Sequence, residues 1–214
     1  MKKMKFYEVE QLRDVRALVR RAGALFGWRT AYRQLNKKRD IEDYTYRQLE
    51  NEMDALGTAL CDLGLKGKHI AVLGVNCYQW VLSYVSVICG VGVVVPMDKE
   101  LSADDLTKLI IKSDVSAIIL SKEYLKTVEK MLPSCPELKT CIVMDEAGDP
   151  IPEGWYTIPR LVQYGMKLLS QGERCFIDAH IDDQCLSEIL FTSGTTGANT
   201  ESGCPRCVAG CRNG

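Results

Sequence analysis

Short apolar runs rich in β-branched residues alternate with helical patterns through the middle of this chain. The predicted strands are residues 69–75, 92–97, 115–120 and 141–144, and the predicted helices between them are residues 77–89, a segment beginning at Ser102, and residues 122–131. Only short connections separate them. This alternation favours a mainly parallel sheet that is flanked by helices. The sequence therefore predicts an α/β fold.

Residues 76–97, within this alternation, allow a second interpretation as a transmembrane helix. No charged residue occurs from position 76 to position 97, which is long enough for a membrane span. Gly90, Gly92 and Pro96 interrupt its second half, and β-branched valines follow Gly92. A buried helix at 77–89 followed by a buried strand at 92–97 is therefore favoured over a transmembrane helix.

The N-terminal region predicts an amphipathic helix over residues 11–26. Its apolar positions are Leu12, Val15, Leu18, Val19, Ala22 and Leu25, and its basic positions are Arg13, Arg16, Arg20 and Arg21. We expect the basic side to be a solvated face, with contact to an anionic surface as the alternative.

A hairpin and a second helix are predicted next. Residues 30–33 and 41–46 read as paired strands around the polar turn 36–40. Thr45 and Gln48 have the spacing of a capping box, and Gly64 marks the end of the helix that they open. Later in the chain, residues 145–154 are expected to form a loop, residues 159–169 a helix and residues 172–184 a polar, irregular connection.

Composition excludes several classes of protein. The 214 residues carry 27 basic and 28 acidic side chains, so no nucleic-acid-binding charge pattern is present. The basic start of the chain runs into polar residues without the apolar core of a signal peptide, and we therefore expect a cytoplasmic protein. In that reducing compartment the seven cysteines scattered through residues 61–185 are expected to be free thiols.

A Gly/Ser/Thr stretch follows the last predicted strand, residues 186–191. It consists of Thr192, Ser193, Gly194, Thr195, Thr196 and Gly197. Glycines allow close backbone approach, and backbone N–H groups beside hydroxyls wrap phosphate oxygens. Taken alone, the stretch fits a phosphate loop or a solvated linker equally well. It matches neither the Walker A pattern nor the dinucleotide-binding glycine pattern.

The chain resembles the AMP-forming adenylating enzymes, and most closely the long-chain fatty-acyl-CoA synthetases. The loop has the family's Thr-Ser-Gly-Thr-Thr-Gly pattern, although Asn199 and Thr200 stand where the family has a small residue and a basic one. The segments 44–46, 76–80 and 90–98 are also similar, so the likeness runs from about residue 29 to residue 197. The resemblance implies the incomplete N-terminal part of such an α/β domain.

The resemblance also implies a function. Such an enzyme is a ligase that forms a carbon–sulfur bond: it activates a small carboxylate, here a fatty acid, with ATP and Mg²⁺, and then transfers the acyl group to coenzyme A. Residues 192–197 would hold the β- and γ-phosphates. The family's catalytic and metal-binding motifs follow the loop, so no catalytic residue and no metal ligand is assigned here. His69 and His180 are expected to be structural or solvent-facing.

Three segments are expected: an N-terminal helical segment (1–28), a partial AMP-binding domain (29–199), and an unrelated cysteine-rich tail (200–214). The tail has no apolar periodicity, and we expect it to be disordered or the product of a frameshift or truncation. Cys204, Cys207 and Cys211 leave a metal site as an alternative. If the coding DNA past Gly197 encodes nothing similar in any frame, the frameshift explanation is wrong.

Two other functions stay open at this point. The chain could be part of an amino-acid adenylation domain, or a non-catalytic interaction module that has kept the fold. The chain alone is expected not to turn over substrate, because the residues that the family uses for adenine, magnesium and the thiol step are absent from it. A transmembrane segment is not expected, peripheral membrane contact is left open, and oligomeric state is not predicted.

Overall fold

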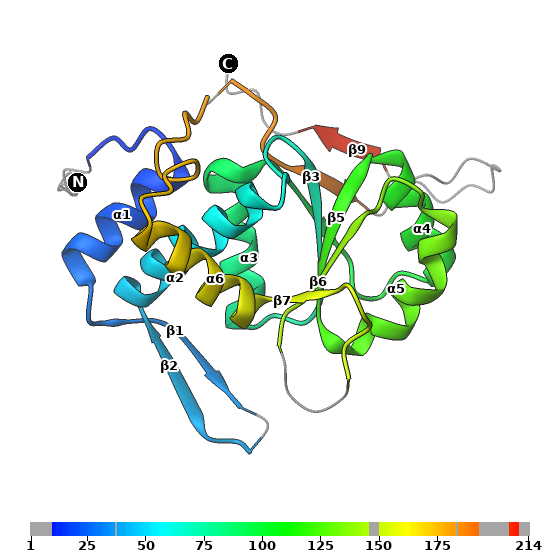
Figure 1. Cartoon of the computed structure of the whole chain (residues 1–214), viewed down its shortest axis with the longest axis horizontal. Coiled ribbons are helices and arrows are strands. Elements are labelled where there is room, and N and C mark those ends of the chain that lie inside the picture. The colour runs from blue at the N-terminus through cyan, green and yellow to red at the C-terminus, as the bar shows by residue number, and fades with distance from the viewer. Residues whose placement is uncertain (1–9, 37, 146–149, 183, 193–205, 210–214) are drawn as a thin grey trace, which may run out of the picture.

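A five-stranded parallel sheet forms the centre of the molecule (Figure 1). The computed structural model describes residues 10–36, 38–145, 150–182, 184–192 and 206–209. In spatial order the strands are β4 (Val93–Met97), β3 (His69–Leu73), β5 (Val115–Leu120), β6 (Thr140–Val143) and β7 (Tyr156–Thr157). The predicted α/β fold with a mainly parallel sheet is confirmed. The two-residue strand β7 was not predicted.

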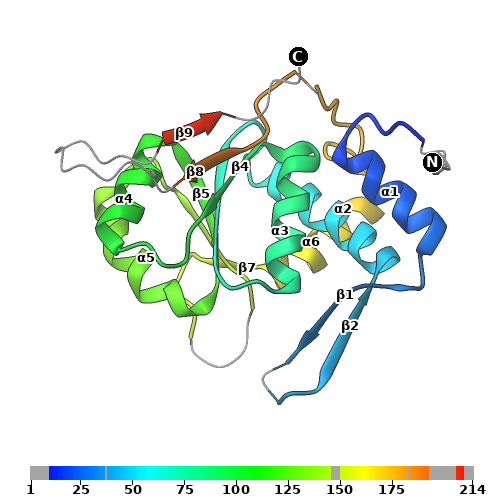
Figure 2. The same cartoon turned by 180° about the vertical axis from the view of Figure 1, so that it is seen from behind.

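Helices cover both faces of this sheet. One face packs against α2 (Tyr46–Asp62), α3 (Tyr78–Ser86) and α6 (Ile158–Ser170), and the other against α4 (Ala103–Lys112) and α5 (Leu125–Met131). Figures 1 and 2 show these two groups on opposite sides of the strands. The first helix of the chain, α1 (Val15–Phe26), packs against α2 on the side that faces away from the sheet.

The strands are buried on both sides, as their apolar runs require. In β3, Ile70 and Val72 belong to the core beneath α2, whereas Ala71 and Leu73 belong to the core beneath α4. Successive side chains of a strand point to opposite faces, so one short run supplies both cores.

The uncharged segment folds as a helix and a strand. Helix α3 continues into a π-helical turn (Val87–Val91), in which Gly90 has a φ of 141°, and β4 follows. That φ suits glycine, because other residues rarely adopt it. Within the described residues, no helix has the length and apolar character that crossing a bilayer requires.

The hairpin and the second helix form close to their predicted positions. Strands β1 (Thr30–Leu35) and β2 (Ile41–Thr45) pair antiparallel. The Thr45 hydroxyl accepts a hydrogen bond from the Gln48 backbone N–H at 3.1 Å. The Gln48 side chain, however, donates to Glu52 at 2.8 Å, so this side chain turns along the helix. Gly64, with a φ of 76°, follows the end of α2 as predicted.

The predicted solvated basic face of α1 is wrong in part. Arg16 is only 8% exposed and donates to the carbonyl oxygens of Phe176 at 2.8 Å and Ile177 at 3.2 Å. Arg20 forms an ion pair with Asp54 of α2 at 2.6 Å. These two arginines therefore face inward, because the neighbouring surface offers carboxylates and carbonyls.

The last described strands lie outside the five-stranded sheet. Strand β8 (Ile189–Thr192) pairs antiparallel with β9 (Arg206–Ala209). Strand β9 lies within segment 200–214, for which the sequence predicts no regular structure, so the structure differs from that prediction over these four residues. Cys204 and Cys211 lie outside the described residues.

Candidate functional site

Strand β8 runs alongside the edge strand β4 in the same direction. Glu188 and Val94 form a parallel bridge, and the Val94 N–H donates to the Ser187 carbonyl at 3.0 Å. Figure 2 shows the two strands next to each other. Because the direction is shared, Thr192 lies at the end of the sheet where β3, β4, β5 and β6 also end. In open α/β sheets this carboxyl edge is where ligands bind.

Strand β8 packs against the body of the protein with one face, as the alternating burial of its side chains shows. Ile189 is buried and Phe191 is half-buried in the core shared with α4 and α5, whereas Leu190 is exposed. This pattern is that of a strand with one covered face. Strand β8 is therefore held against the body of the protein and ends at Thr192.

The connection that leads into β8 is anchored at two points. Phe176 is fully buried against α2, at a place where a Cβ on Gly57 would overlap its ring. Arg16 binds the carbonyls of Phe176 and Ile177 from the other side, and that of Ala179 as well. Residues 172–184 were predicted to be polar and irregular, and Phe176 was the buried anchor that this prediction missed. Its signal was a single aromatic residue in a polar segment.

The predicted phosphate loop is described only at its first residue. Thr192 ends β8, while Ser193, Gly194, Thr195, Thr196 and Gly197 lie outside the described residues. The assignment of these residues to phosphate binding therefore stays a prediction. What the structure adds is the position from which the loop departs.

At the same carboxyl end of the sheet, the ends of β3, β5 and β6 are tied together. The Ser121 hydroxyl accepts from the Val75 N–H at 3.2 Å and lies 3.3 Å from the Met144 sulfur. Gly74 passes so close that a Cβ at this position would overlap the Ser121 hydroxyl. The carboxyl ends of β3, β5 and β6 are thus joined through the Ser121 side chain. The sequence analysis missed Ser121, although it directly follows a predicted strand.

The acidic residue named in the resemblance, Asp98, has a local role in the structure. Its carboxylate accepts from the Glu100 N–H at 2.9 Å in the turn that follows β4. In the described part of the chain, no three His, Cys, Asp or Glu side chains come together to hold a metal ion.

The two histidines lie where the sequence predicts. Nδ1 of His69 is 2.6 Å from the Ser113 carbonyl oxygen, so the protonated nitrogen donates to it and joins β3 to the end of α4. His180 is exposed. A structural histidine and a solvent-facing one are confirmed.

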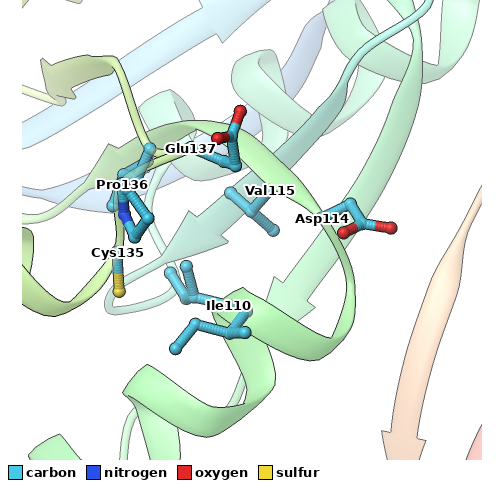
Figure 3. A pocket seen from close by; sticks show the side chains of 8 residues that line it. Ile110, Asp114, Val115, Cys135, Pro136 and Glu137 are labelled. Atoms are coloured by element: carbon cyan, nitrogen blue, oxygen red, sulfur yellow. The ribbon is translucent and has the colours of Figure 1, made fainter.

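A small hollow lies at the opposite end of the sheet, where the parallel strands begin. It has a volume of about 100 Å³ and lies at the amino end of β5, beside Val115 (Figure 3). Ile110, Cys135 and Pro136 supply apolar walls, and Asp114 and Glu137 lie at the rim. Ligand pockets are usually about 300 Å³ or larger. This hollow is too small for a nucleotide and lies away from Thr192.

A sequence model of one family matches most of the chain. Described as "AMP-binding enzyme", it matches residues 19–199. This range includes the sheet, its covering helices and the whole of the predicted loop.

Curated relatives cover a similar part of the chain. Long-chain-fatty-acid–CoA ligase 1 of Cavia porcellus is 28% identical over 181 residues, covering 72% of this chain and 23% of its own length. The 3-oxocholest-4-en-26-oate–CoA ligase of Rhodococcus rhodochrous is 28% identical over 160 residues, covering 74% of this chain and 28% of its own length. The chain thus spans about a quarter of the length of these relatives.

Solved structures show the same fold. The anthranilate CoA ligase AuaEII, in complex with anthranoyl-AMP, has a TM-score of 0.74 at 18% identity and covers 94% of this chain, which matches 35% of that protein. The adenylation domain of a carboxylate reductase from Mycobacterium chelonae has a TM-score of 0.74 at 18% identity, with 94% and 34% covered.

Proposed function

Because this chain belongs to the AMP-binding enzyme family, we propose that it is the phosphate-holding, N-terminal part of an AMP-forming acyl-CoA ligase that acts on fatty acids. The observation that supports this role is the position of β8. This strand runs parallel to β4 and brings Thr192 to the carboxyl edge of the sheet, where Ser121 joins the ends of β3, β5 and β6. The fatty-acid ligases among the relatives support the choice of substrate.

The proposed reaction brings two anions together. A carboxylate oxygen attacks the α-phosphorus of ATP, forming an acyl-adenylate and releasing pyrophosphate, and the thiol of coenzyme A then accepts the acyl group with release of AMP. Mg²⁺, when bound, neutralises phosphate charge. The binding site must hold the reactants in line and compensate the negative charge that remains.

The contribution of this chain is to grip the phosphates. In the proposal, backbone N–H groups and hydroxyls of residues 192–197 donate hydrogen bonds to the β- and γ-phosphate oxygens and then to the leaving pyrophosphate. Such donors place no fixed positive charge against the nucleotide. The loop begins at Thr192, directly after Ile189 and Phe191, whose packing holds β8 against the body of the protein.

The domain organisation belongs to the same proposal. We propose residues 1–28 as an N-terminal helical segment, residues 29–199 as the partial AMP-binding domain, and residues 200–214 as a tail without a role in it. We place the protein in the cytoplasm. The 214 residues alone do not complete the reaction, since no catalytic residue is assigned to them. Carboxylate-dependent exchange of labelled pyrophosphate into ATP by the purified chain would contradict this.

Direct titration tests the phosphate grip. Calorimetry with ATP is expected to show binding by the 214-residue chain. The double variant Thr195→Val with Thr196→Val is expected to lower the affinity for ATP by about 10- to 100-fold, because hydrogen bonds to a charged group are lost. Ser134→Ala, an exposed hydroxyl beyond α5, is the matched control and leaves binding unchanged. Equal affinities for the loop variants and the parent would overturn the assignment.

One sequence feature supports a second candidate, a non-catalytic interaction module. Asn199 and Thr200 stand where the family pattern has a small residue and a cation. A monodisperse chain that melts cooperatively and binds no ATP would favour this module. ATP binding that depends on the loop hydroxyls would exclude it.

A further inference from the structure

Two cysteines meet where the connection between α6 and β8 passes the end of α2. Cys61 lies in the last turn of α2 and is 9% exposed, whereas Cys175 lies in the connection and is half-buried. The two thiols are hydrogen-bonded to each other. Both are free. The fold thus places two thiols from distant parts of the sequence within reach of one another.

Neighbouring contacts hold both cysteines in place. One turn before Cys61, Gly57 lies so close to Phe176 that a Cβ at this position would overlap the ring. Phe176 is fully buried in the same apolar core as Cys61, and Cys175 packs against that core. The Cys175 N–H also donates to the Glu173 carboxylate at 2.7 Å. The approach of the two sulfurs therefore follows from the packing of the segments that carry them.

A cation lies beside Cys175. The Lys66 ammonium donates to the Cys175 thiol, with Nζ and Sγ 3.6 Å apart, and Lys66 is exposed. An ammonium at this distance from a reacting sulfur can give a proton to a group that leaves as the sulfur reacts. The cluster thus contains an accessible sulfur, a proton donor and a second thiol.

The two thiols differ in their access to solutes. Burial, followed by the neighbouring Cys175, raises the pKa of Cys61 to about 12, so this thiol stays protonated at neutral pH. The thiolate is the form that attacks an oxidant, and a buried, protonated thiol is inert toward one in solution. Cys175 is therefore the sulfur that meets an oxidant first, and Cys61 reacts only with its neighbour.

We propose that Cys61 and Cys175 form a redox-active pair, which hydrogen peroxide converts into a disulfide between α2 and the connection to β8. The Cys175 sulfur attacks one peroxide oxygen, the O–O bond breaks, and Lys66 protonates the leaving hydroxide. The Cys61 sulfur then displaces hydroxide from the sulfenic acid at Cys175, and this hydroxide takes the Cys61 proton and leaves as water. The proton that Cys175 gave up returns to Lys66 through water. Two thiols are thereby oxidised to one disulfide, and one peroxide is reduced to two waters.

The modification is reversible, because a small thiol can attack the disulfide and restore both cysteines. In a reducing compartment such disulfides are transient and serve in redox sensing. The disulfide cross-links the connection that leads into β8 to the end of α2, so oxidation is expected to raise the midpoint of thermal unfolding. Neither ATP nor a fatty acid takes part. The proposal can therefore fail while the proposed function holds, and the reverse is also true.

Peptide mapping of the 214-residue chain after treatment with hydrogen peroxide tests the pair. Free thiols are blocked with iodoacetamide, and the chain is then digested with trypsin and Asp-N. The expected fragments 54–61 and 175–177 contain one cysteine each. We expect them to be joined in a species that is two hydrogens lighter than their sum and that dithiothreitol separates. In concentrated guanidinium chloride this species forms much more slowly, because the thiols are no longer held together.

Variants assign the role of each residue. Cys61→Ala and Cys175→Ala each abolish the joined fragments and the rise of the unfolding midpoint on oxidation. The matched control Cys185→Ala, at an exposed cysteine, leaves both unchanged. Lys66→Met slows disulfide formation by at least about tenfold, as for a lost proton donor. Lys68→Met, at an exposed lysine two residues later, leaves the rate unchanged.

Three results would overturn the pair. They are oxidation of Cys175 to the sulfinic acid without a bond to Cys61, a disulfide from Cys175 to a cysteine of the tail, and joined fragments that form equally fast in the unfolded chain. Equal rates for Lys66→Met and Lys68→Met would overturn the role of Lys66. Circular dichroism of every variant, unchanged from the parent, establishes that a lost disulfide is not lost folding.

Discussion

Helices α1 and α4 have similar amphipathic patterns but orient them in opposite ways. In α4, Leu106, Leu109 and Ile110 are buried and Lys108 is exposed. In α1, Arg16 is buried, while Leu18 and Leu25 are exposed. The difference shows that a pattern of apolar and charged residues identifies a helix but does not decide which side of it faces the protein.

The surface beneath each helix explains the difference. Helix α4 lies on β5 and its neighbours, whose side chains form an apolar core. Helix α1 lies on α2, where Glu50 and Asp54 offer carboxylates, and on the connection to β8, which offers carbonyls. Burying arginine there satisfies these acceptors, whereas burying leucine would leave them without partners.

The largest expected effect comes from the inner side of α4. Leu109 is 2% exposed, and Leu109→Ala is expected to lower the free energy of unfolding by about 2–5 kcal/mol, because the variant leaves a cavity in the core. Urea unfolding followed by circular dichroism measures this. A loss below about 1 kcal/mol would mean that α4 is not packed on β5 as described.

The inner side of α1 comes second. Arg16→Met is expected to lower the free energy of unfolding by about 2–3 kcal/mol, since three carbonyls lose a charged donor. Lys108→Met on α4 is the matched control and changes it by less than about 0.5 kcal/mol, because Lys108 is an exposed partner of Asp105. If both variants have equal effects, the two helices do not differ in orientation.

Alkaline pH probes the contact between the hairpin and α3. Tyr44 stacks on Tyr78 with ring centroids 3.7 Å apart, and burial, followed by the Glu42 carboxylate, raises the pKa of Tyr44 from 10.0 to about 12. A raised pKa in the folded state contributes stability that is fully present below pH 10 and is lost as the pH rises through about 12. Thermal unfolding midpoints should therefore fall between pH 10 and pH 12.

Tyr44→Phe separates this ionisation from other alkaline effects. The variant is expected to lose less stability than the parent over the same pH interval, because it has no phenol to ionise at this position. An identical pH dependence for variant and parent would show that Tyr44 is not the group responsible.

The smallest effect is expected on the outer side of α1. Leu18→Ala should change the free energy of unfolding by no more than about 0.5 kcal/mol, as for most exposed substitutions. The same urea titration measures it beside Leu109→Ala. A loss of more than about 2 kcal/mol for Leu18→Ala would show that the Leu18 side chain is buried.

The sequence predicts the sheet well because its strands depend on local pattern. Strand β5 coincides with the predicted residues 115–120, and the N-caps at Thr45 and Ser102 form as their spacing indicates. Strand β7 escapes prediction because two residues carry no periodicity and pair only when β6 lies beside them.

The orientation of α1 could not be predicted, because it depends on groups distant in the sequence. Arg16 binds carbonyls 160 and 161 residues away, and their positions exist only after α6 has packed on α2. The candidate site likewise has one part that the sequence predicts and one part that it does not. The motif at 192–197 is visible in the sequence, while the strand ends tied by Ser121 appear only in the folded sheet.

The central claim is that β8 carries a phosphate-binding loop to the carboxyl edge of the sheet. Backbone amide NMR of the 214-residue chain, titrated with ATP, tests it most directly. We predict that the largest shifts fall on residues 192–197, with smaller ones at Val75 and Ser121, and that the amides of α1 do not move. Shifts concentrated on α1, or an unchanged loop at saturating ATP, would contradict the claim.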